Sequence, residues 1–185
     1  MKEYKNLSKQ CFTKNEFSIV PIRNQDRYEI MKWRNDQIYH LRQKTPLNKK
    51  NQDDYFKYVI SALFEKINPD QILFSFLKND NCVGYGGLVH IDWINKNAEI
   101  SFVLRTEDEV SYFRKYWGVY LDLIENVAFA ELNFHKIYVY AFDLRPHLYK
   151  VLLESNYFKD AVLNDHVSVK GKYIDIVIYS KIRNL

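Results

Sequence analysis

The stretch that decides the fold runs from Ala98 to Leu132 and reads AEISFVL-RTEDEVS-YFRKYWGVYLDLIENVAFAEL. Its first seven residues form an apolar run with β-branched and aromatic side chains, which predicts a buried strand. Apolar residues then recur at spacings of four, three, four and four, which predicts one face of a helix: Trp117, Leu121, Ile124, Ala128 and Leu132. Arg114 and Lys115 stand where this helix should begin. Because backbone N–H groups and the helix dipole favour anions at a helix N-terminus, the stretch predicts a binding site for a pyrophosphate.

Length and composition indicate a single globular domain. The chain has 185 residues, of which 47% are hydrophobic and 16% aromatic, and this argues against disorder. A net charge of +4 suits an anionic small ligand as well as nucleic acid and decides neither. Cys11 and Cys82 are too few for a disulfide framework or a metal cluster, so we expect no metal. No apolar run approaches the ~18 residues of a transmembrane helix and no signal peptide is recognisable, so we expect a cytoplasmic protein.

The order of the predicted elements favours one mixed sheet. Residues 1–16 predict a loose arm or a short edge hairpin, and residues 17–185 one α/β (α+β) domain. Strands are predicted at 17–23, 72–78, 82–92, 98–104, 136–142, 167–169 and 173–182, and helices at 26–35, 48–67, about 117–132 and 146–155. The helix 48–67 is expected to bury Phe56, Val59, Ile60, Leu63 and Ile67. Because a helix joins strands 98–104 and 136–142, we expect these strands to be parallel neighbours with a right-handed crossover.

Three glycines stand in one predicted strand, at Gly84, Gly86 and Gly87. They weaken a strand unless it bulges or another backbone approaches closely. We therefore expect one of these two features in strand 82–92.

Several segments of the sequence resemble segments of the Gcn5-related N-acetyltransferase (GNAT) superfamily. Residues 98–105, AEISFVLR, resemble its fourth strand, and residues 128–137, AFAELNFHKI, resemble the junction of its central helix and fifth strand. Residues 31–36, MKWRND, are similar to the first helix of the branch with ribosomal-protein and nucleotide-sugar acyltransferases. Residues 83–92, VGYGGLVHID, are similar to the third strand of the amino-sugar enzymes. The resemblance covers residues 17–182. It implies a central mixed, mostly antiparallel sheet flanked by helices, with splayed parallel fourth and fifth strands.

Two features depart from the family's pattern. Its acyl-coenzyme A loop usually reads Gln/Arg-x-x-Gly-x-Gly/Ala, whereas residues 113–117 here are bulky or charged and only Gly118 follows. The last helix has Pro146 in the slot of the usual Asn and Leu153 in the slot of the usual general-acid Tyr. Tyr149 lies one turn earlier than that slot. These departures leave a non-catalytic GNAT-like binding module open as an alternative.

The resemblance implies acetyl-CoA or another acyl-CoA as co-substrate. In the family the pantetheine arm lies along the fourth strand and bonds its exposed backbone as an added strand would. The cofactor-binding residues implied are Phe102, Val103 and Leu104 for the pantetheine arm, Arg114, Lys115, Trp117 and Gly118 for the pyrophosphate, and in addition Arg105. We expect direct attack of the acceptor amine, because neither cysteine belongs to a recognisable nucleophile motif.

The predicted catalytic residues are Glu99, His90 and Tyr149. Glu99 is a carboxylate at the head of an apolar strand, where the family often places a base. Its alternative is an ordinary strand-end residue paired with a cation, and His90 is alternatively a core histidine. His90 and Asp92 share one strand face, so one of them could relay the proton. The backbone N–H of Val103 is a candidate for the oxyanion, and Tyr149 for protonating the leaving thiolate.

The predicted acceptor site lies around the first helix. Its candidate residues are Trp33, Arg34, Asn35, Tyr39, His40, Arg42 and Gln43, together with Asp92. Arginine suits a phosphate and aromatic rings stack on a base or sugar, so the cluster resembles a nucleotide-sugar platform.

The function predicted from these features is N-acylation. An acyl group, acetyl or alternatively hydroxybutyryl, would pass to the amine of a nucleotide-linked amino-deoxy sugar in surface polysaccharide synthesis. We expect a monomer or homodimer that binds neither nucleic acid nor membrane. A protein or ribosomal-protein N-terminal acetyltransferase is the alternative within the class, and it predicts an open peptide groove.

Overall fold

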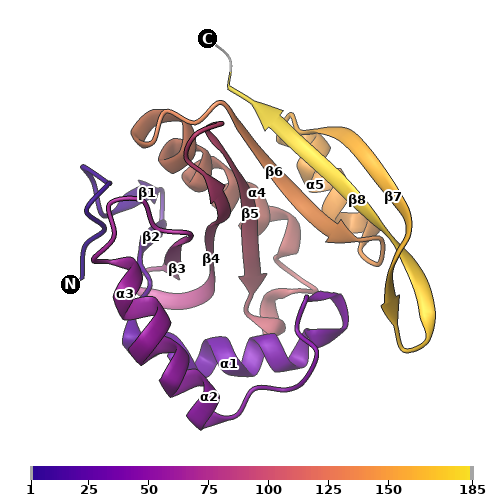
Figure 1. Cartoon of the computed structure of the whole chain (residues 1–185), viewed down its shortest axis with the longest axis horizontal. Coiled ribbons are helices and arrows are strands. Elements are labelled where there is room, and N and C mark those ends of the chain that lie inside the picture. The colour runs from indigo at the N-terminus through magenta and orange to yellow at the C-terminus, as the bar shows by residue number, and fades with distance from the viewer. Residues whose placement is uncertain (1, 184–185) are drawn as a thin grey trace.

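The computed structural model describes residues 2–183 and contains one eight-stranded sheet in the order β1-β2-β3-β4-β5-β6-β8-β7 (Figure 1). The strands are β1 (Phe12–Lys14), β2 (Phe17–Pro21), β3 (Ile72–Lys78), β4 (Asn81–Asp92), β5 (Asn97–Leu104), β6 (Lys136–Phe142), β7 (Phe158–Val169) and β8 (Lys172–Ile182). β5 and β6 are parallel, and the other neighbouring strands of the described chain are antiparallel. The expected mixed, mostly antiparallel sheet is confirmed.

The helices cover both faces of this sheet. They are α1 (Arg27–Asp36), α2 (Lys49–Asp54), α3 (Ser61–Leu63), α4 (Phe113–Glu125) and α5 (Pro146–Glu154). Short 3-10 turns lie at Asn24–Asp26, Ile38–His40 and Thr106–Asp108, and π-helical turns at Tyr55–Ile60 and Asn126–Glu131. Within residues 2–183 no helix combines the length and the hydrophobicity that crossing a membrane requires.

Alternate residues of β5 face the two helical layers. Phe102 packs against α4, where its ring stacks on Tyr120 at a centroid distance of 3.8 Å. Glu99 points to the opposite face, because it contacts Arg42 of the segment that follows α1. In Figure 1, α4 and α5 lie behind the sheet, whereas α1 and α2 lie in front of its lower end. Residues on β5 can therefore serve two ligands that approach from opposite faces.

The predicted helix 48–67 differs from the structure in its buried face. Phe56, Ile60 and Leu63 are buried, but Val59 is 38% exposed and Ile67 is 74% exposed. The π-helical turn Tyr55–Ile60 shifts the helical period from that of an α-helix, so the face expected at α-helical spacing is not kept. Ile67 lies beyond the end of α3 at Leu63. The prediction was therefore wrong for these two residues.

The glycines of β4 mark close approaches of neighbouring backbones. A Cβ atom on Gly86 would lie 2.0 Å from the carbonyl oxygen of Ser101, and one on Gly87 would lie 1.9 Å from that of Ile72. A β-bulge also follows Val89. The strand thus has both features that the glycines predicted.

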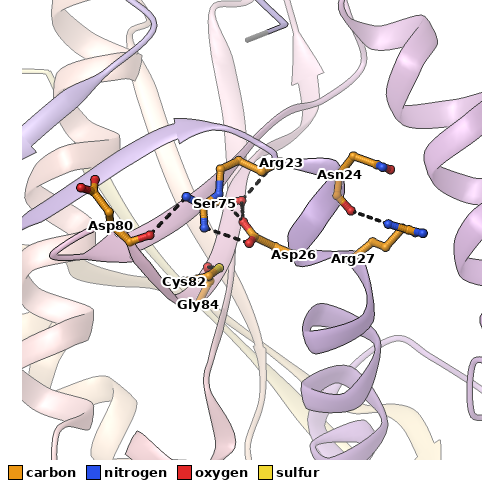
Figure 2. A network of polar contacts seen from close by, with 8 residues as sticks. All are labelled: Arg23, Asn24, Asp26, Arg27, Ser75, Asp80, Cys82 and Gly84. Atoms are coloured by element: carbon orange, nitrogen blue, oxygen red, sulfur yellow. Dashed lines mark hydrogen bonds and ion pairs between the residues drawn. The ribbon is translucent and has the colours of Figure 1, made fainter.

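A buried network of polar contacts holds the residues that precede α1 against the sheet (Figure 2). Arg23 donates from Nε and Nη2 to the two carboxylate oxygens of Asp26 at 2.7 and 2.9 Å, and Ser75 Oγ donates to Asp26 at 2.6 Å. Arg23 also donates to the carbonyl oxygen of Asp80 in the β3–β4 turn. Because Asp26 is only 6% exposed, these bonds tie the start of α1 firmly to the sheet.

Candidate active site at the fork of two strands

β5 and β6 pair over only three residues before they diverge. The pairs are Asn97 with Lys136, Ala98 with Ile137, and Glu99 with Tyr138, although β5 continues to Leu104 and β6 to Phe142. The other edge of β5 is paired with β4 as far as Leu104, and the other edge of β6 is paired with β8 along its length. The predicted splay is confirmed, and it leaves two facing strand edges whose backbone groups can bond an extended ligand.

A cavity of about 440 Å³ occupies this fork. Its wall includes Ile100, Ser101 and Phe102 of β5 and residues 139–142 of β6. Near the α4–α5 layer it is lined by Trp117, Arg145 and Leu148. The remaining lining residues belong to the face of the sheet on the side of α1: Arg34, His40, Leu41, Arg42, Tyr55, Asp70, Gln71, Leu73, Tyr85, Val89, His90, Ile91 and Glu99. The cavity therefore lies between the strands and is lined by residues from both helical layers.

Glu99 stands at the last paired position of the fork, where its carboxylate is 5% exposed. Its Oε1 accepts from Nη2 of Arg42, and its Oε2 lies 2.8 Å from Nδ1 of His90. Because a carboxylate accepts hydrogen bonds, Nδ1 carries the proton and Nε2 of neutral His90 can act as a base. The imidazole is 61% exposed, and its Nε2 has no hydrogen-bond partner among the described residues. The two residues predicted for proton transfer thus lie in direct contact.

The bulge in β4 explains how His90 reaches Glu99. Val89 pairs with Glu99 and Asp92 with Asn97, so two residues of β4 lie opposite one residue of β5. His90 has a positive φ of 48°, which is uncommon for a residue with a side chain. Asp92 lies past the bulge and accepts from the backbone N–H groups of Ile94 and Asn95, away from the cavity.

The residues predicted around the first helix divide into three groups. Arg34, His40 and Arg42 line the cavity. Asn35 and Gln43 support them: Gln43 accepts from Arg34 Nε at 2.9 Å and donates to Asn35, which in turn bonds the backbone of Leu47. Trp33 is a core residue at 1% exposure, and Tyr39 is exposed with its ring against His40. Arg34 also donates to the hydroxyl of Tyr85, another cavity residue.

The predicted cofactor residues surround the start of α4. Phe102 and Trp117 line the cavity and meet edge to face at 4.9 Å, whereas Val103 and Leu104 are buried in β5. Arg105 donates to Asp108, Arg114 to Glu154 and Lys115 to Glu16, so each of these cations is paired with a carboxylate. Gly118 has open space where a side chain would project. α4 begins at Phe113 without a side-chain cap, which leaves N–H groups of its first turn available to an anion.

Tyr149 is not among the residues that line the cavity. Its hydroxyl donates to Asp143 at 2.8 Å, and its ring stacks on Tyr179 of β8. Burial and the neighbouring Asp143 carboxylate raise the pKa of the Tyr149 hydroxyl. The structure therefore does not bring Tyr149 together with Glu99 and His90.

Sequence reasoning missed a buried ion pair in the cavity wall. Arg145, which is 4% exposed at the start of α5, donates to Glu109 at 2.7 Å and contacts His40. Burial, and secondarily the Arg145 charge, lowers the pKa of His40 to about 3, so His40 is neutral at physiological pH. Burial raises the pKa of Glu109, while Arg145 opposes that shift. The Arg145–Pro146 step, a cation directly before a helix-starting proline, is the one sequence signal available for this residue.

Comparison with known proteins gives these features a family. A profile of the acetyltransferase (GNAT) domain matches residues 19–178. No curated protein sequence matches significantly. Mutant forms of the spermidine/spermine N-acetyltransferase SpeG from Vibrio cholerae share 16% identity with a TM-score of 0.75, covering 91% of this chain and 95% of that one. A spermidine N-acetyltransferase from Vibrio cholerae in complex with CoA and spermine shares 17% identity with this chain at a TM-score of 0.74, and the match covers 91% of this chain and 96% of that one.

At these identities the solved structures establish the fold, whereas the domain profile covers most of the chain and establishes the family. The family assignment supports the enzyme rather than the non-catalytic module. The chain belongs to the GNAT acetyltransferase domain family and is an acyl-CoA-dependent N-acyltransferase whose co-substrate is acetyl-CoA or another acyl-CoA.

Proposed function

We propose that this enzyme acylates the amine of a nucleotide-linked amino-deoxy sugar in surface polysaccharide synthesis. The observation that carries the proposal is the cationic acceptor side of the cavity. Arg34 and Arg42 line it beside the Glu99–His90 pair, and Tyr55, Tyr85 and Tyr140 supply aromatic surface. Arginine binds phosphate oxygens in pairs, and tyrosine rings stack on a base or sugar while their hydroxyls bond polar groups.

The acyl donor would lie in the fork. The edges of β5 and β6 beyond Glu99 are free to bond a pantetheine arm, and the first turn of α4 offers N–H groups to its pyrophosphate. Acetyl is the acyl group we propose, with hydroxybutyryl as the larger alternative.

Acyl transfer would take place between these two ligands. The neutral amine attacks the thioester carbonyl carbon, a C–N bond forms, and the C–S bond breaks as coenzyme A leaves with the bonding electron pair as its thiolate. The proton lost by the amine passes to Nε2 of His90, while Glu99 holds the Nδ1–H and stabilises the imidazolium. The backbone N–H of Val103 is our candidate for stabilising the tetrahedral oxyanion.

A polyamine is the second candidate acceptor, because similar folds belong to spermidine N-acetyltransferases. A polyamine is cationic at neutral pH, so Arg34, whose hydrogen-bond partners Gln43 and Tyr85 are neutral, would repel it. Of the carboxylates in the cavity wall, Glu99 is paired with Arg42 and Asp70 with Lys66. The charge of the site therefore favours an anionic acceptor.

The test is release of coenzyme A thiol from acetyl-CoA with a panel of acceptors. The panel contains dTDP- and UDP-linked amino-deoxy sugars, spermidine, and a peptide with a free N-terminus. We expect turnover with one or more nucleotide-linked sugars at a kcat/KM at least about tenfold above the other two classes, as one arginine–phosphate interaction would give. Preference for spermidine or for the peptide would overturn the proposal in favour of the corresponding alternative.

A further inference from the structure

Both oxygens of the Glu99 carboxylate are occupied, but the two partners are held differently. Glu99 is fixed within β5 and 5% exposed, whereas the Arg42 side chain is 45% exposed and belongs to the irregular segment 41–48 between α1 and α2. Arg42 also lies over the ring of Tyr140, with its guanidinium carbon 4.8 Å from the centroid. It makes no further hydrogen bond within residues 2–183. The carboxylate is therefore held within the sheet, whereas the guanidinium is on a solvent-exposed side chain of an irregular segment, with Glu99 as its one hydrogen-bonding partner among these residues.

Arg34 gives the contrast within the same cavity. It donates to Gln43 and to Tyr85, and Gln43 is itself held by Asn35. Two neutral partners fix this guanidinium without neutralising its charge. Arg34 is thus a rigid cation that an anion can approach, whereas Arg42 must exchange one anion for another.

The charges around Glu99 mean that the carboxylate loses its main counter-charge when Arg42 exchanges Glu99 for another anion. Arg42 of segment 41–48 and His90 of β4 contact the carboxylate, and Tyr138 of β6 is paired with Glu99 in the sheet. Tyr140 lies under the Arg42 guanidinium, and Asp70 and Arg34 belong to the same cavity wall. Burial, and then the Glu99 charge, raises the pKa of Tyr138, while Arg42 lowers it. Tyr138 thus experiences opposing effects from Glu99 and Arg42, so removing Arg42 leaves the carboxylate charge uncompensated.

We propose that Arg42 determines acceptor specificity by neutralising Glu99 until a phosphate group of the acceptor draws the guanidinium away. This inference deepens the proposed function and rests on its anionic acceptor. While Arg42 is on Glu99, the imidazolium that forms on His90 during transfer gains little from the compensated carboxylate. Once Arg42 binds a phosphate, the full charge of Glu99 stabilises that imidazolium. An amine without a phosphate then reacts slowly even when it reaches the same place.

The first experiment compares two acceptors that carry the same amine. One is a dTDP-linked amino-deoxy sugar, and the other is the phosphate-free methyl glycoside of that sugar. In Arg42→Gln we expect kcat/KM for the nucleotide-linked sugar to fall about tenfold or more through KM, as loss of an arginine–phosphate pair implies. For the methyl glycoside we expect kcat to rise about fivefold, because the carboxylate is no longer neutralised.

Lys44→Gln is the matched control. Lys44 is an exposed cation of the same segment and does not line the cavity, so its loss should change neither kcat nor KM for either acceptor. Thermal unfolding of both variants checks that they are folded. Equal losses of kcat/KM on both acceptors in Arg42→Gln would assign the residue a structural role. A loss of kcat/KM on the nucleotide-linked sugar with no gain of kcat on the glycoside would make it a binding residue alone. Either outcome overturns the proposal.

The second experiment separates this inference from the proposed function. The wild-type enzyme is assayed with a phosphate-free amine that it accepts, chosen from the panel above. Turnover is then measured with and without added inorganic pyrophosphate or dTDP. We expect kcat to rise about fivefold in wild type and to stay constant in Arg42→Gln, because the anion draws Arg42 from Glu99. If no nucleotide-linked sugar is acylated, the proposed function is overturned, but the effect of the added anion on kcat can still be measured. A wild-type kcat that does not respond to either anion would overturn the role of Arg42.

Discussion

Asp26 and Glu99 are both buried carboxylates that bond an arginine, yet their surroundings differ. Asp26 accepts two bonds from Arg23, three residues away, and a third from Ser75. Arg23 is only 18% exposed. Glu99 accepts one bond from Arg42, which is 57 residues away and 45% exposed, and one from a largely exposed histidine.

The difference separates a structural ion pair from a reactive one. The Asp26 pair is bidentate, local and mostly buried, and both oxygens of its carboxylate are taken by Arg23 and Ser75. The Glu99 pair opens on the cavity, and each partner of its carboxylate is reachable from solvent. The same two functional groups therefore stabilise one region and leave the other able to exchange partners.

The largest expected effect is on stability, at the closed pair. Asp26→Ala should lower the free energy of unfolding by about 3–5 kcal/mol, because it leaves the Arg23 charge and Ser75 without their partner. Urea denaturation measures this change. Activity per folded molecule should stay within about twofold of wild type, since the cavity walls are intact. A loss below about 1 kcal/mol would remove the distinction between the two pairs.

The second effect is on turnover, at the open pair. Glu99→Gln should lower kcat about 10²- to 10³-fold at neutral pH, because the imidazolium loses its counter-charge, with little change in coenzyme A affinity. Steady-state kinetics and calorimetric titration with coenzyme A measure the two quantities. His90→Gln should lower kcat to a similar extent. An unchanged rate in Glu99→Gln would remove this residue from the catalytic assignment.

The third effect is a pH dependence of stability at His40, which contacts Arg145 of the buried Arg145–Glu109 pair. Folded His40 binds its proton near pH 3, whereas unfolded His40 binds it near 6.5. The unfolded chain therefore holds the extra proton between these values, and the free energy of unfolding falls as the pH drops below 6.5, by up to about 1.4 kcal/mol per pH unit. His40→Gln should remove this contribution. Denaturation of both proteins at pH 7.5, 6 and 5 tests it, and parallel pH profiles would contradict the assignment.

The smallest effect is at the exposed pair of Arg114 and Glu154. Arg114 is 78% exposed at the start of α4, so Arg114→Gln should weaken coenzyme A binding by about 0.5–1 kcal/mol, and less at high salt. Glu154→Gln should have the opposite sign, because it frees the arginine for an anion. Calorimetric titrations at two salt concentrations measure both changes. Affinities that move in the same direction would exclude competition between the carboxylate and the ligand.

Most of the fold could be predicted because its decisive strands are apolar and bounded by turns. The predicted ranges 72–78 and 136–142 match β3 and β6. β7 was predicted only at its last three residues, since its long polar edge is largely exposed and lacks the apolar pattern of a strand. The π-helical turns were missed because a single turn with i→i+5 hydrogen bonds is too short to leave a repeated pattern in the sequence.

The candidate site was less predictable because its contacts are distant in sequence. Glu99 and His90 could be placed on neighbouring strands by their spacing, but nothing in the pattern pairs Glu99 with Arg42. Arg145 and Tyr85 were not identified, since a single arginine or tyrosine carries no signal until the fold brings it to a cavity. The local motifs thus locate the fork, and tertiary structure supplies its charges.

The fork also divides the molecule mechanically. Three residue pairs join the sheet of β1–β5 to that of β6–β8, apart from the helical layers and connecting segments. An acyl-CoA arm bonded along both edges would act as the missing ninth strand, so the donor would complete the protein's own sheet. Amide hydrogen exchange along β6 and the far half of β5 should slow markedly when coenzyme A is present, which would make the co-substrate a reversible part of the scaffold.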